Sequence, residues 1–299
     1  MERLKKKPIG ILFESREWSI FALGDHIAAM GVPVKLFDLQ DELDAEGIRS
    51  CGLIVNRVFA SAVFRGHQKA HEQMPAVIEL LRKYGIRMIN PAETHYYEIS
   101  KTRIKEKLLR QGFLVPRLYD TFSPATNTEY AGTLFPCIVK PDCGGRTTNT
   151  FIAYSREELL ENLKNMPDIL FISEEYIRPE KGYITRIEVI DRACRLAVKR
   201  SVTENGLSAY HLGSAYEIYD DLPDAVRDAA IKAMDCLKIE VGSLDIIENT
   251  KGAFIIDVNP ASNVSEDNTE MFNFDLMKET AAYAVKIYDN LSKEKRTNA

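Results

Sequence analysis

Residues 242–260 (GSLDIIENTKGAFIIDVNP) constrain the fold most, because they read as two apolar strands joined by a short turn. If the hairpin is centred on Lys251, Asp245 lies opposite Asp257, since both are equally far from that centre. Opposed residues of an antiparallel pair share one face, with Cβ atoms roughly 5 Å apart. Asn259 lies two residues beyond Asp257 and points to the same face. The hairpin therefore gathers two carboxylates and an amide oxygen.

Such a gathering of like charges is unfavourable unless a cation neutralises it. Oxygen ligands without His or Cys favour Mg²⁺ or Mn²⁺, and Mg²⁺ in proteins is commonly bound together with phosphates. A solvated polar face of an amphipathic hairpin would show the same alternation and is the commoner structure. Both interpretations stay open at this point.

Several basic residues could supply a phosphate site. Lys140 ends an apolar strand, and Gly144 and Gly145 follow it, so that backbone N–H groups can approach phosphate oxygens beside a point charge. Arg186 and Arg200 fall on successive strands of a second predicted hairpin, and guanidinium groups stabilise charge that develops in phosphoryl transfer. Taken singly, the glycines indicate only a turn and the arginines an exposed strand face.

A third segment suits a hinge between lobes. Glu174, Glu175, Tyr176 and Ile177 come at the end of a predicted strand. Backbone groups there could bind an adenine edge, and a carboxylate could bind the ribose. Without that context the segment is simply the end of a strand.

Strands and helices alternate over the first ninety residues, which predicts a parallel sheet covered by helices. No G-x-G-x-x-G motif follows the first strand, so the phosphate loop of a dinucleotide-binding domain is absent. The expected strands are residues 8–13, 34–38, 53–56 and 86–90, and the expected helices are 18–30 and 76–84, the latter ending at Gly85.

The rest of the chain is richer in strands and predicts α+β lobes after a boundary near residue 90. Ser100 is placed to cap a helix over residues 101–111. The expected strands are residues 135–140, 150–154, 170–176, 183–190 and 195–202, and the further helices are 155–165, 223–238 and 272–290.

Composition excludes several classes of protein. The 299 residues carry 39 Lys+Arg against 44 Asp+Glu, a net charge of −5, so we expect no nucleic-acid surface. A hydrophobic content of 45% without biased segments excludes a disordered chain. No apolar run is long enough for a membrane helix or a signal peptide, so we expect no membrane partner. Five scattered cysteines without a C-x-x-C pair predict reduced thiols and a cytoplasmic location.

The order of these features resembles the ATP-grasp superfamily. The resemblance is strongest to the branch that contains the ribosomal-protein glutamate ligase and the carrier-protein ligases of lysine and arginine biosynthesis. The features are, in order, Lys101 on a helix, the V-K-P of Lys140, the E-Y-I of Glu175 to Ile177, Arg186, the pair Lys199 and Arg200, and finally Asp245, Asp257 and Asn259.

This resemblance implies an ATP-grasp fold, with an α/β Rossmann-like domain over residues 1–92. Two α+β lobes over residues 93–172 and 173–299 would surround the nucleotide. It also implies an ATP-dependent carboxylate–amine ligase that forms an amide or peptide bond through an acylphosphate and releases ADP and phosphate. The implied substrate is an amino acid or peptide-like molecule, a carrier protein is a candidate partner, and homo-oligomers are common among relatives. The alternatives are an ADP-forming small-molecule kinase and a non-catalytic nucleotide-binding module.

The resemblance also assigns roles to residues. ATP would contact Lys101, Lys140, Lys199, Gly144, Gly145 and the hinge Glu174, Glu175, Tyr176 and Ile177. Mg²⁺, or Mn²⁺, would be held by Asp245, Asp257 and Asn259, and the transferring phosphoryl group would be stabilised by Arg186 and Arg200.

Four features depart from that branch. Asp257 stands where glutamate is usual, and Ile184 where an acidic residue is usual, so ribose binding would fall to another group such as Glu180. Residues 147–149 (Thr-Thr-Asn) replace further glycine in the phosphate loop, and Tyr210 lies where the substrate loop usually has asparagine.

Overall fold

The computed structural model describes residues 6–125, 132–208, 213–262 and 264–297. The chain forms two units and returns to the first one twice. Unit 1 comprises residues 1–94, 239–241 and 261–299, and unit 2 comprises residues 95–238 and 242–260. The three regions expected from the sequence, with boundaries near residues 92 and 172, stay predictions.

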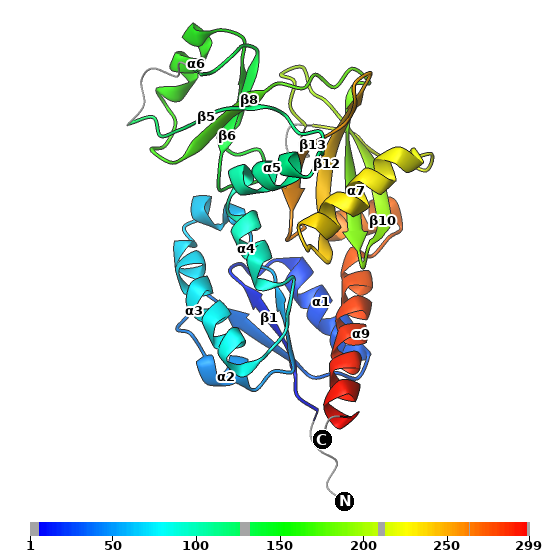
Figure 1. The fold of residues 1–299 in the computed structure, drawn as a ribbon. Helices are drawn as coiled ribbons and strands as arrows, with labels where there is room; N and C mark the ends of the chain where they lie inside the picture. Colours follow the sequence, from blue (N-terminus) through cyan, green and yellow to red (C-terminus); the bar gives the residue numbers. More distant parts are fainter. Residues whose placement is uncertain (1–5, 126–131, 209–212, 263, 298–299) are drawn as a thin grey trace, which may run out of the picture. The chain divides into compact units, whose positions relative to one another are not determined.

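A four-stranded sheet lies at the centre of unit 1, around β1 (Figure 1). Its strand order is β2-β1-β3-β4, and its pairing is parallel throughout. The parallel sheet expected from the alternation of strands and helices is confirmed. The central strand β1 is buried along its length. A Cβ added to Gly10 in β1 would lie 2.5 Å from the Ile54 side chain, so glycine is needed for this close packing. The strands are β1 (Ile9–Phe13), β2 (Val34–Asp38), β3 (Leu53–Asn56) and β4 (Met88–Ile89).

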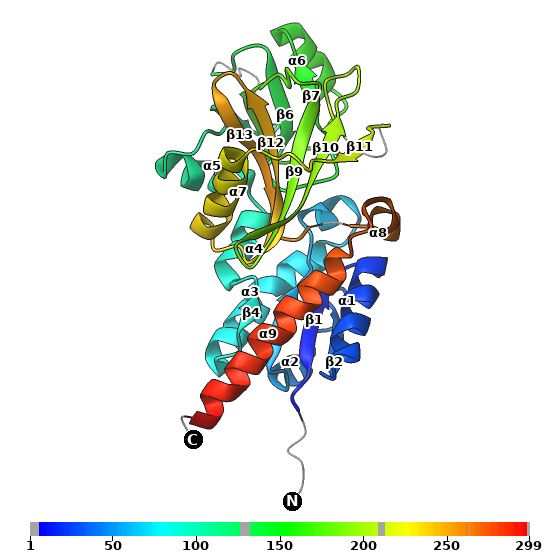
Figure 2. The ribbon, with the colours of Figure 1, turned by 90° about the vertical axis from the view of Figure 1, so that its right-hand side faces the viewer.

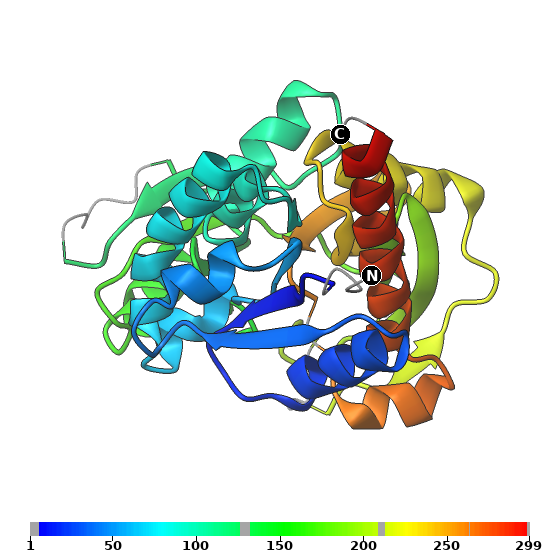
Figure 3. The same ribbon diagram turned by 90° about the horizontal axis from the view of Figure 1, so that it is seen from below.

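Helices cover this sheet. The first and last helices of unit 1, α1 and α9, pack side by side (Figure 2, Figure 3). An apolar cluster joins α2 and α3 to the sheet through Ile48, Met74, Val77 and their neighbours. The helices are α1 (Trp18–Ala29), α2 (Ala45–Arg49), the 3₁₀ helix η1 (Ala60–Phe64), α3 (Gln68–Tyr84), α4 (Ala92–Glu98), which begins in unit 1, α8 (Glu266–Phe272) and α9 (Leu276–Thr297).

Two helix predictions in unit 1 needed correction. Helix α3 begins at Gln68 rather than at residue 76, so it contains Pro75, which lacks the N–H for a helical hydrogen bond. Burial of Ala70 and Met74 favours the helical turn before the proline. The predicted helix over residues 272–290 is two helices, because Asn273 adopts a left-handed conformation (φ 46°) and ends α8.

Unit 2 contains two assemblies of strands. The first has the order β5-β8-β6-β7, with its ladders antiparallel (Figure 1). Strand β5 was not predicted, because its sequence LYDTF mixes polar and apolar residues and is only partly buried. The elements are α5 (Lys101–Arg110), β5 (Leu118–Phe122), β6 (Cys137–Pro141), β7 (Phe151–Ala153), α6 (Arg156–Leu163) and β8 (Phe171–Glu175).

The second assembly has the order β11-β10-β9-β12-β13, and α7 packs against it (Figure 2). The pairs β9–β10, β10–β11 and β12–β13 are antiparallel. Both hairpins expected here are confirmed, whereas the short strand β11 was not predicted. The elements are β9 (Tyr183–Ile190), β10 (Ala193–Ser201), β11 (Tyr216–Ile218), α7 (Asp224–Cys236), β12 (Val241–Asn249) and β13 (Gly252–Asn259).

The β12–β13 hairpin has the predicted pairing for a reason the sequence did not reveal. Asn249 pairs with Gly252, so the turn has two residues, and a regular ladder would place Asp245 opposite Ile256. The register shifts between Asp245 and Ile246, which leaves Ile256 as the extra residue of a β-bulge. Asp245 therefore pairs with Asp257. A three-residue turn without a bulge would give the same pair.

None of the described helices is long and apolar enough to cross a membrane.

Candidate functional site

Asp245 is the counterion of two arginines on one face of the five-stranded sheet. Its Oδ2 lies 2.7 Å from Arg200 Nη2, and its Oδ1 lies 3.4 Å from Arg186 Nη1. Arg200 pairs with Ile184 across β9 and β10, and Arg186 follows two residues later, so both arginines share this face. Each carboxylate oxygen thus meets one guanidinium group, and the sheet brings together three of the residues singled out in the sequence.

Arg186 has a second acidic partner, because its Nε donates to Glu188 Oε1 at 2.8 Å. Burial alone would favour the neutral guanidine, but the carboxylates of Glu188 and Asp245 outweigh it and raise the pKa of Arg186. Arg186 therefore stays charged in its buried position.

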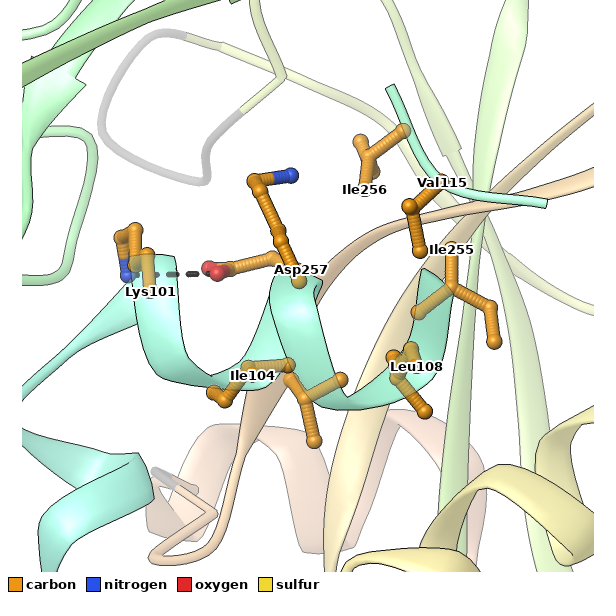
Figure 4. Close-up of a pocket in the computed structure, with 9 residues that line it drawn as sticks. Lys101, Ile104, Leu108, Val115, Ile255, Ile256 and Asp257 are labelled. Carbon is orange, nitrogen blue, oxygen red and sulfur yellow. Dashed lines mark ion pairs between the residues drawn. The ribbon is translucent and has the colours of Figure 1, made fainter. Parts of the chain in front are cut away.

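Asp257, on the neighbouring strand, is paired with a lysine. Its Oδ1 lies 3.1 Å from Lys101 Nζ, which also donates to the Gly144 carbonyl at 3.0 Å (Figure 4). Burial would raise the pKa of Asp257, yet Lys101 and then Lys140 hold it below its ordinary value. The carboxylate is therefore ionised, which is the state that a metal ligand requires.

The start of helix α5 places Lys101. Ser100 is the N-cap and accepts from the Arg103 N–H at 3.3 Å. Asp142, in the segment after β6, accepts from Ser100 Oγ at 2.8 Å and from the Thr102 N–H at 2.7 Å. These bonds tie the first turn of α5 to the start of the predicted phosphate loop, so that Lys101 and Gly144 lie together.

A buried carboxylate links Lys140 to a lysine that the sequence reasoning missed. Glu174 Oε1 lies 2.9 Å from Lys140 Nζ, and Glu174 Oε2 lies 2.7 Å from Lys105 Nζ. Lys140 also donates to the carbonyl of Ile256, the bulged residue, at 3.0 Å. Lys105 could have been noticed, because it lies four residues after Lys101 on the apolar stripe of α5.

A narrow pocket lies between α5 and β13, with room for about one water molecule. Lys101 and Asp257 (Figure 4), together with Lys105, provide its polar part. Apolar side chains line the rest: Ile104, Leu108, Val115, Ile255, Ile256 and Val258. The pocket therefore shows where the charged network borders the apolar interior of unit 2.

The bulge also changes the apolar surroundings. Strict alternation along β13 would point Ile256 away from the face of Asp257, but the bulge turns it to the face of Ile247 and Phe254. These residues form an apolar cluster with Ile177 and Ile184, and Val202 packs at its edge. Ile177 of the predicted hinge and Ile184, which replaces an acidic residue, thus lie together in an apolar environment.

The remaining hinge residues differ in their surroundings. Glu174 is buried between the two lysines rather than open at the strand end. Glu175 is half-buried, and its Oε2 accepts from the Arg117 N–H at 3.4 Å. Tyr176 is half-buried, and Glu180 is exposed.

Lys199 is not brought together with the other predicted residues. It pairs with Thr185 across β10 and β9, so it lies on the opposite face of the sheet from Arg200. There its Nζ lies 4.2 Å from the centroid of the Tyr219 ring and 3.7 Å from Asp221 Oδ1. A cation–π contact accounts for its position.

The loop after Lys140 is unusual in its backbone. Arg146, Thr147 and Asn149 have φ values of 60°, 59° and 54°, a region that favours glycine, while Gly144 and Gly145 do not. The residues after the two glycines, rather than the glycines themselves, therefore adopt the left-handed backbone conformation. Tyr210, the fourth departure from the family pattern, lies outside the described residues.

The donor set of Asp245, Asp257 and Asn259 fits a hard divalent cation. The two carboxylates are directly opposed, and Asn259 pairs with Ser243 on the same face of the hairpin. The Ser243 hydroxyl is fully buried and has no hydrogen-bond partner in the described part of the chain. An orphaned polar atom beside three candidate oxygen ligands is what a site completed by a bound group would leave.

Comparison with known proteins agrees with this geometry. Residues 78–283 match the family described as the RimK-like ATP-grasp domain. A probable alpha-L-glutamate ligase of Klebsiella pneumoniae (strain 342) is 25% identical over 229 residues, covering 70% of this chain and 76% of that protein. Another, of Pasteurella multocida (strain Pm70), is 24% identical over 192 residues, or 62% of this chain, and this chain spans only 60% of its length.

Solved structures show the same fold. The ATP-grasp ligase PsnB, complexed with a minimal precursor, Mg and ADP, superposes with a TM-score of 0.66 at 15% identity, covering 94% of this chain and 97% of PsnB. The ATP-grasp fold expected from the ordered motifs is thereby confirmed. The family match covers well over half of the residues, and so the chain belongs to the RimK-like ATP-grasp family.

Proposed function

We propose that this chain is an ATP-dependent carboxylate–amine ligase that forms an amide or peptide bond through an acylphosphate and releases ADP and phosphate. The observation that carries the proposal is the directly opposed pair of Asp245 and Asp257. Four cationic side chains surround this pair: Lys101, Lys140, Arg186 and Arg200. Carboxylates that can bind a metal ion, surrounded by cations that can bind phosphate, suit the transfer of a phosphoryl group.

The cations have distinct tasks in this proposal. Lys101 and Lys140 bind phosphate oxygens of ATP, and both already have their ammonium groups fixed by a carboxylate and a backbone carbonyl. Arg186 and Arg200 hold the charge that develops on the transferring group, where donors fixed in advance are most effective. Gly144 and Gly145 would supply backbone N–H groups to the phosphates.

Asp245, Asp257 and Asn259 would hold Mg²⁺, with Mn²⁺ as an alternative that accepts the same ligands. A divalent ion bound there supplies neutralising charge to the phosphate oxygens. The chain's own residues then exchange partners. The carboxylates give up Lys101, Arg186 and Arg200, and these cations turn to phosphate.

The nucleobase is proposed to lie near the hinge. Glu175, Tyr176 and Ile177 would present backbone groups to adenine, and the apolar cluster around Ile177 suits a flat ring. Glu180 remains the candidate for the ribose. We assign Glu174 an indirect role, since lysines occupy both of its oxygens, and Lys199 none, since it faces away.

An amino acid or a peptide is the proposed acyl or amine substrate. The relatives named above are probable alpha-L-glutamate ligases, and PsnB was solved with a minimal precursor. A carrier or target protein is a partner consistent with those relatives, as is self-association of this chain.

The test is release of ADP with each amino acid in turn, in the presence of Mg²⁺ and with hydroxylamine as a trap. Formation of a hydroxamate is expected, because hydroxylamine attacks an acylphosphate. ADP release without hydroxamate, together with a phosphorylated hydroxyl acceptor detected by mass spectrometry, would instead identify a kinase and refute the ligase. Absence of ADP release with every acceptor, despite nucleotide binding, would favour a binding module.

A further inference from the structure

Glu174 occupies an unusual position for a carboxylate. It is 1% exposed, and its two oxygens meet two different lysines, Lys140 from β6 and Lys105 from α5. Both lysine side chains are at least nine-tenths buried. One buried carboxylate therefore joins a strand that carries a proposed phosphate ligand to a helix that carries a lysine of no assigned role.

Strand pairing explains why Glu174 acts on Lys140. Glu174 in β8 pairs with Ile138 in β6, and Lys140 lies two residues along the same face. The Lys140 ammonium also donates to the Ile256 carbonyl at 3.0 Å. Within the described residues, two of its three N–H bonds are thus directed to protein acceptors, which leaves one to meet a ligand.

The charge of Glu174 is the reason for a lysine at position 105. Ile104 and Leu108 continue the apolar stripe of α5, and a leucine or methionine at position 105 would be buried there at lower cost than an ammonium group. Without a second cation, however, the far oxygen of Glu174 would lack a partner in an environment where that is costly.

We propose that Lys105 is a positioning residue, which holds the second oxygen of Glu174 so that this carboxylate directs the Lys140 ammonium toward a nucleotide phosphate. This inference rests on the proposed function, because it assumes that Lys140 binds phosphate. Lys105 itself does not touch the nucleotide.

Its ionisation agrees with this role. Burial lowers the pKa of Lys105, Glu174 partly restores it, and the nearby Lys140 lowers it again, to about 8. Lys105 therefore still carries its charge in most molecules at neutral pH.

The experiment measures the Kd of AMPPNP with Mg²⁺ by calorimetry for five variants. Lys105→Met is expected to weaken binding about tenfold, because Glu174 would no longer be held by a second cation and would direct the Lys140 ammonium less firmly. Lys105→Arg, which keeps the charge, should restore the Kd to within about threefold of wild type. Lys107→Met is the matched control, since it removes the same charge from the same helix but does not line the pocket, and its Kd should be unchanged.

The fourth variant is Glu174→Gln, and the fifth combines it with Lys105→Met, which also covers the case in which Lys105→Met alone fails to fold. If Lys105 acts through Glu174, the double variant should bind no more weakly than Glu174→Gln alone. A Kd for Lys105→Met equal to wild type, with only a lower melting temperature, would overturn the inference, as would fully additive losses in the double variant. Wild-type protein that binds no AMPPNP would instead refute the proposed function.

Discussion

Replacing Asp245 by asparagine tests the centre of the site, because the structure gives this carboxylate two separable roles. As a counterion it serves Arg200 at 2.7 Å and Arg186 at 3.4 Å. Arg186 keeps Glu188 at 2.8 Å, so Arg200 is the arginine that loses its carboxylate. Removing one partner of a buried pair costs about 3–5 kcal/mol. An asparagine oxygen still accepts one hydrogen bond, so we expect a loss of about 2–3 kcal/mol.

The variant should therefore be folded but less stable, with a melting temperature lower by about 5–10 °C in circular dichroism. As a proposed metal ligand, Asp245 should also be needed for turnover, and we expect ADP release to fall at least about 100-fold. Asp235→Asn is the matched control: Asp235 pairs with Arg192 at the exposed surface, where an ion pair contributes about 0–1 kcal/mol.

The two roles can be refuted separately. Stability equal to that of Asp235→Asn would mean that the arginines do not depend on Asp245. Wild-type turnover would mean that Asp245 is not a metal ligand, whatever the change in melting temperature.

Three other predictions follow from the same contacts. Saturating ATP and Mg²⁺ should slow amide hydrogen exchange in residues 144–150, and unchanged exchange would contradict the phosphate-loop role. Because Lys101 neutralises Asp257 in the free protein, Mg²⁺ and ADP should each bind weakly alone and at least about tenfold more tightly together, as measured by calorimetry; equal affinities would contradict an exchange of partners. The pKa of Lys105 is about 8 in the folded chain and 10.5 ordinarily, so between these pH values the unfolded chain binds more protons than the folded chain. The free energy of unfolding should therefore rise with pH across this window, by on the order of 3 kcal/mol. Urea unfolding near pH 7 and pH 10 should show that rise in wild type and not in Lys105→Met.

Much of the fold was predictable from local patterns. The parallel sheet of unit 1 follows from the alternation of strands and helices, and the Ser100 cap marks the start of α5 correctly. The elements that were predicted wrongly or missed depend on contacts between distant segments. Pro75 lies inside a helix because its neighbours are buried, and β5 and β11 are strands because partners exist to pair with them.

The residues of the candidate site likewise fall into those that local patterns predicted and those that they did not. Asp245 and Asp257 could be paired by counting along one hairpin, although the bulge at Ile256 could not be foreseen. Lys105 was missed because a lysine between apolar residues on a helix reads as solvated until its partner is known. That partner, Glu174, lies 69 residues away (174 minus 105), and no local pattern connects them.

The bulge at Ile256 offsets the short turn of this hairpin. A two-residue turn with the bulge and a three-residue turn without it place the same number of residues between Asp245 and Asp257, and both present the two carboxylates to the same face. The hairpin could therefore exchange one arrangement for the other without insertion or deletion. Among relatives in which the same number of residues separates the two acidic positions, turn length and the presence of the bulge should accordingly change together.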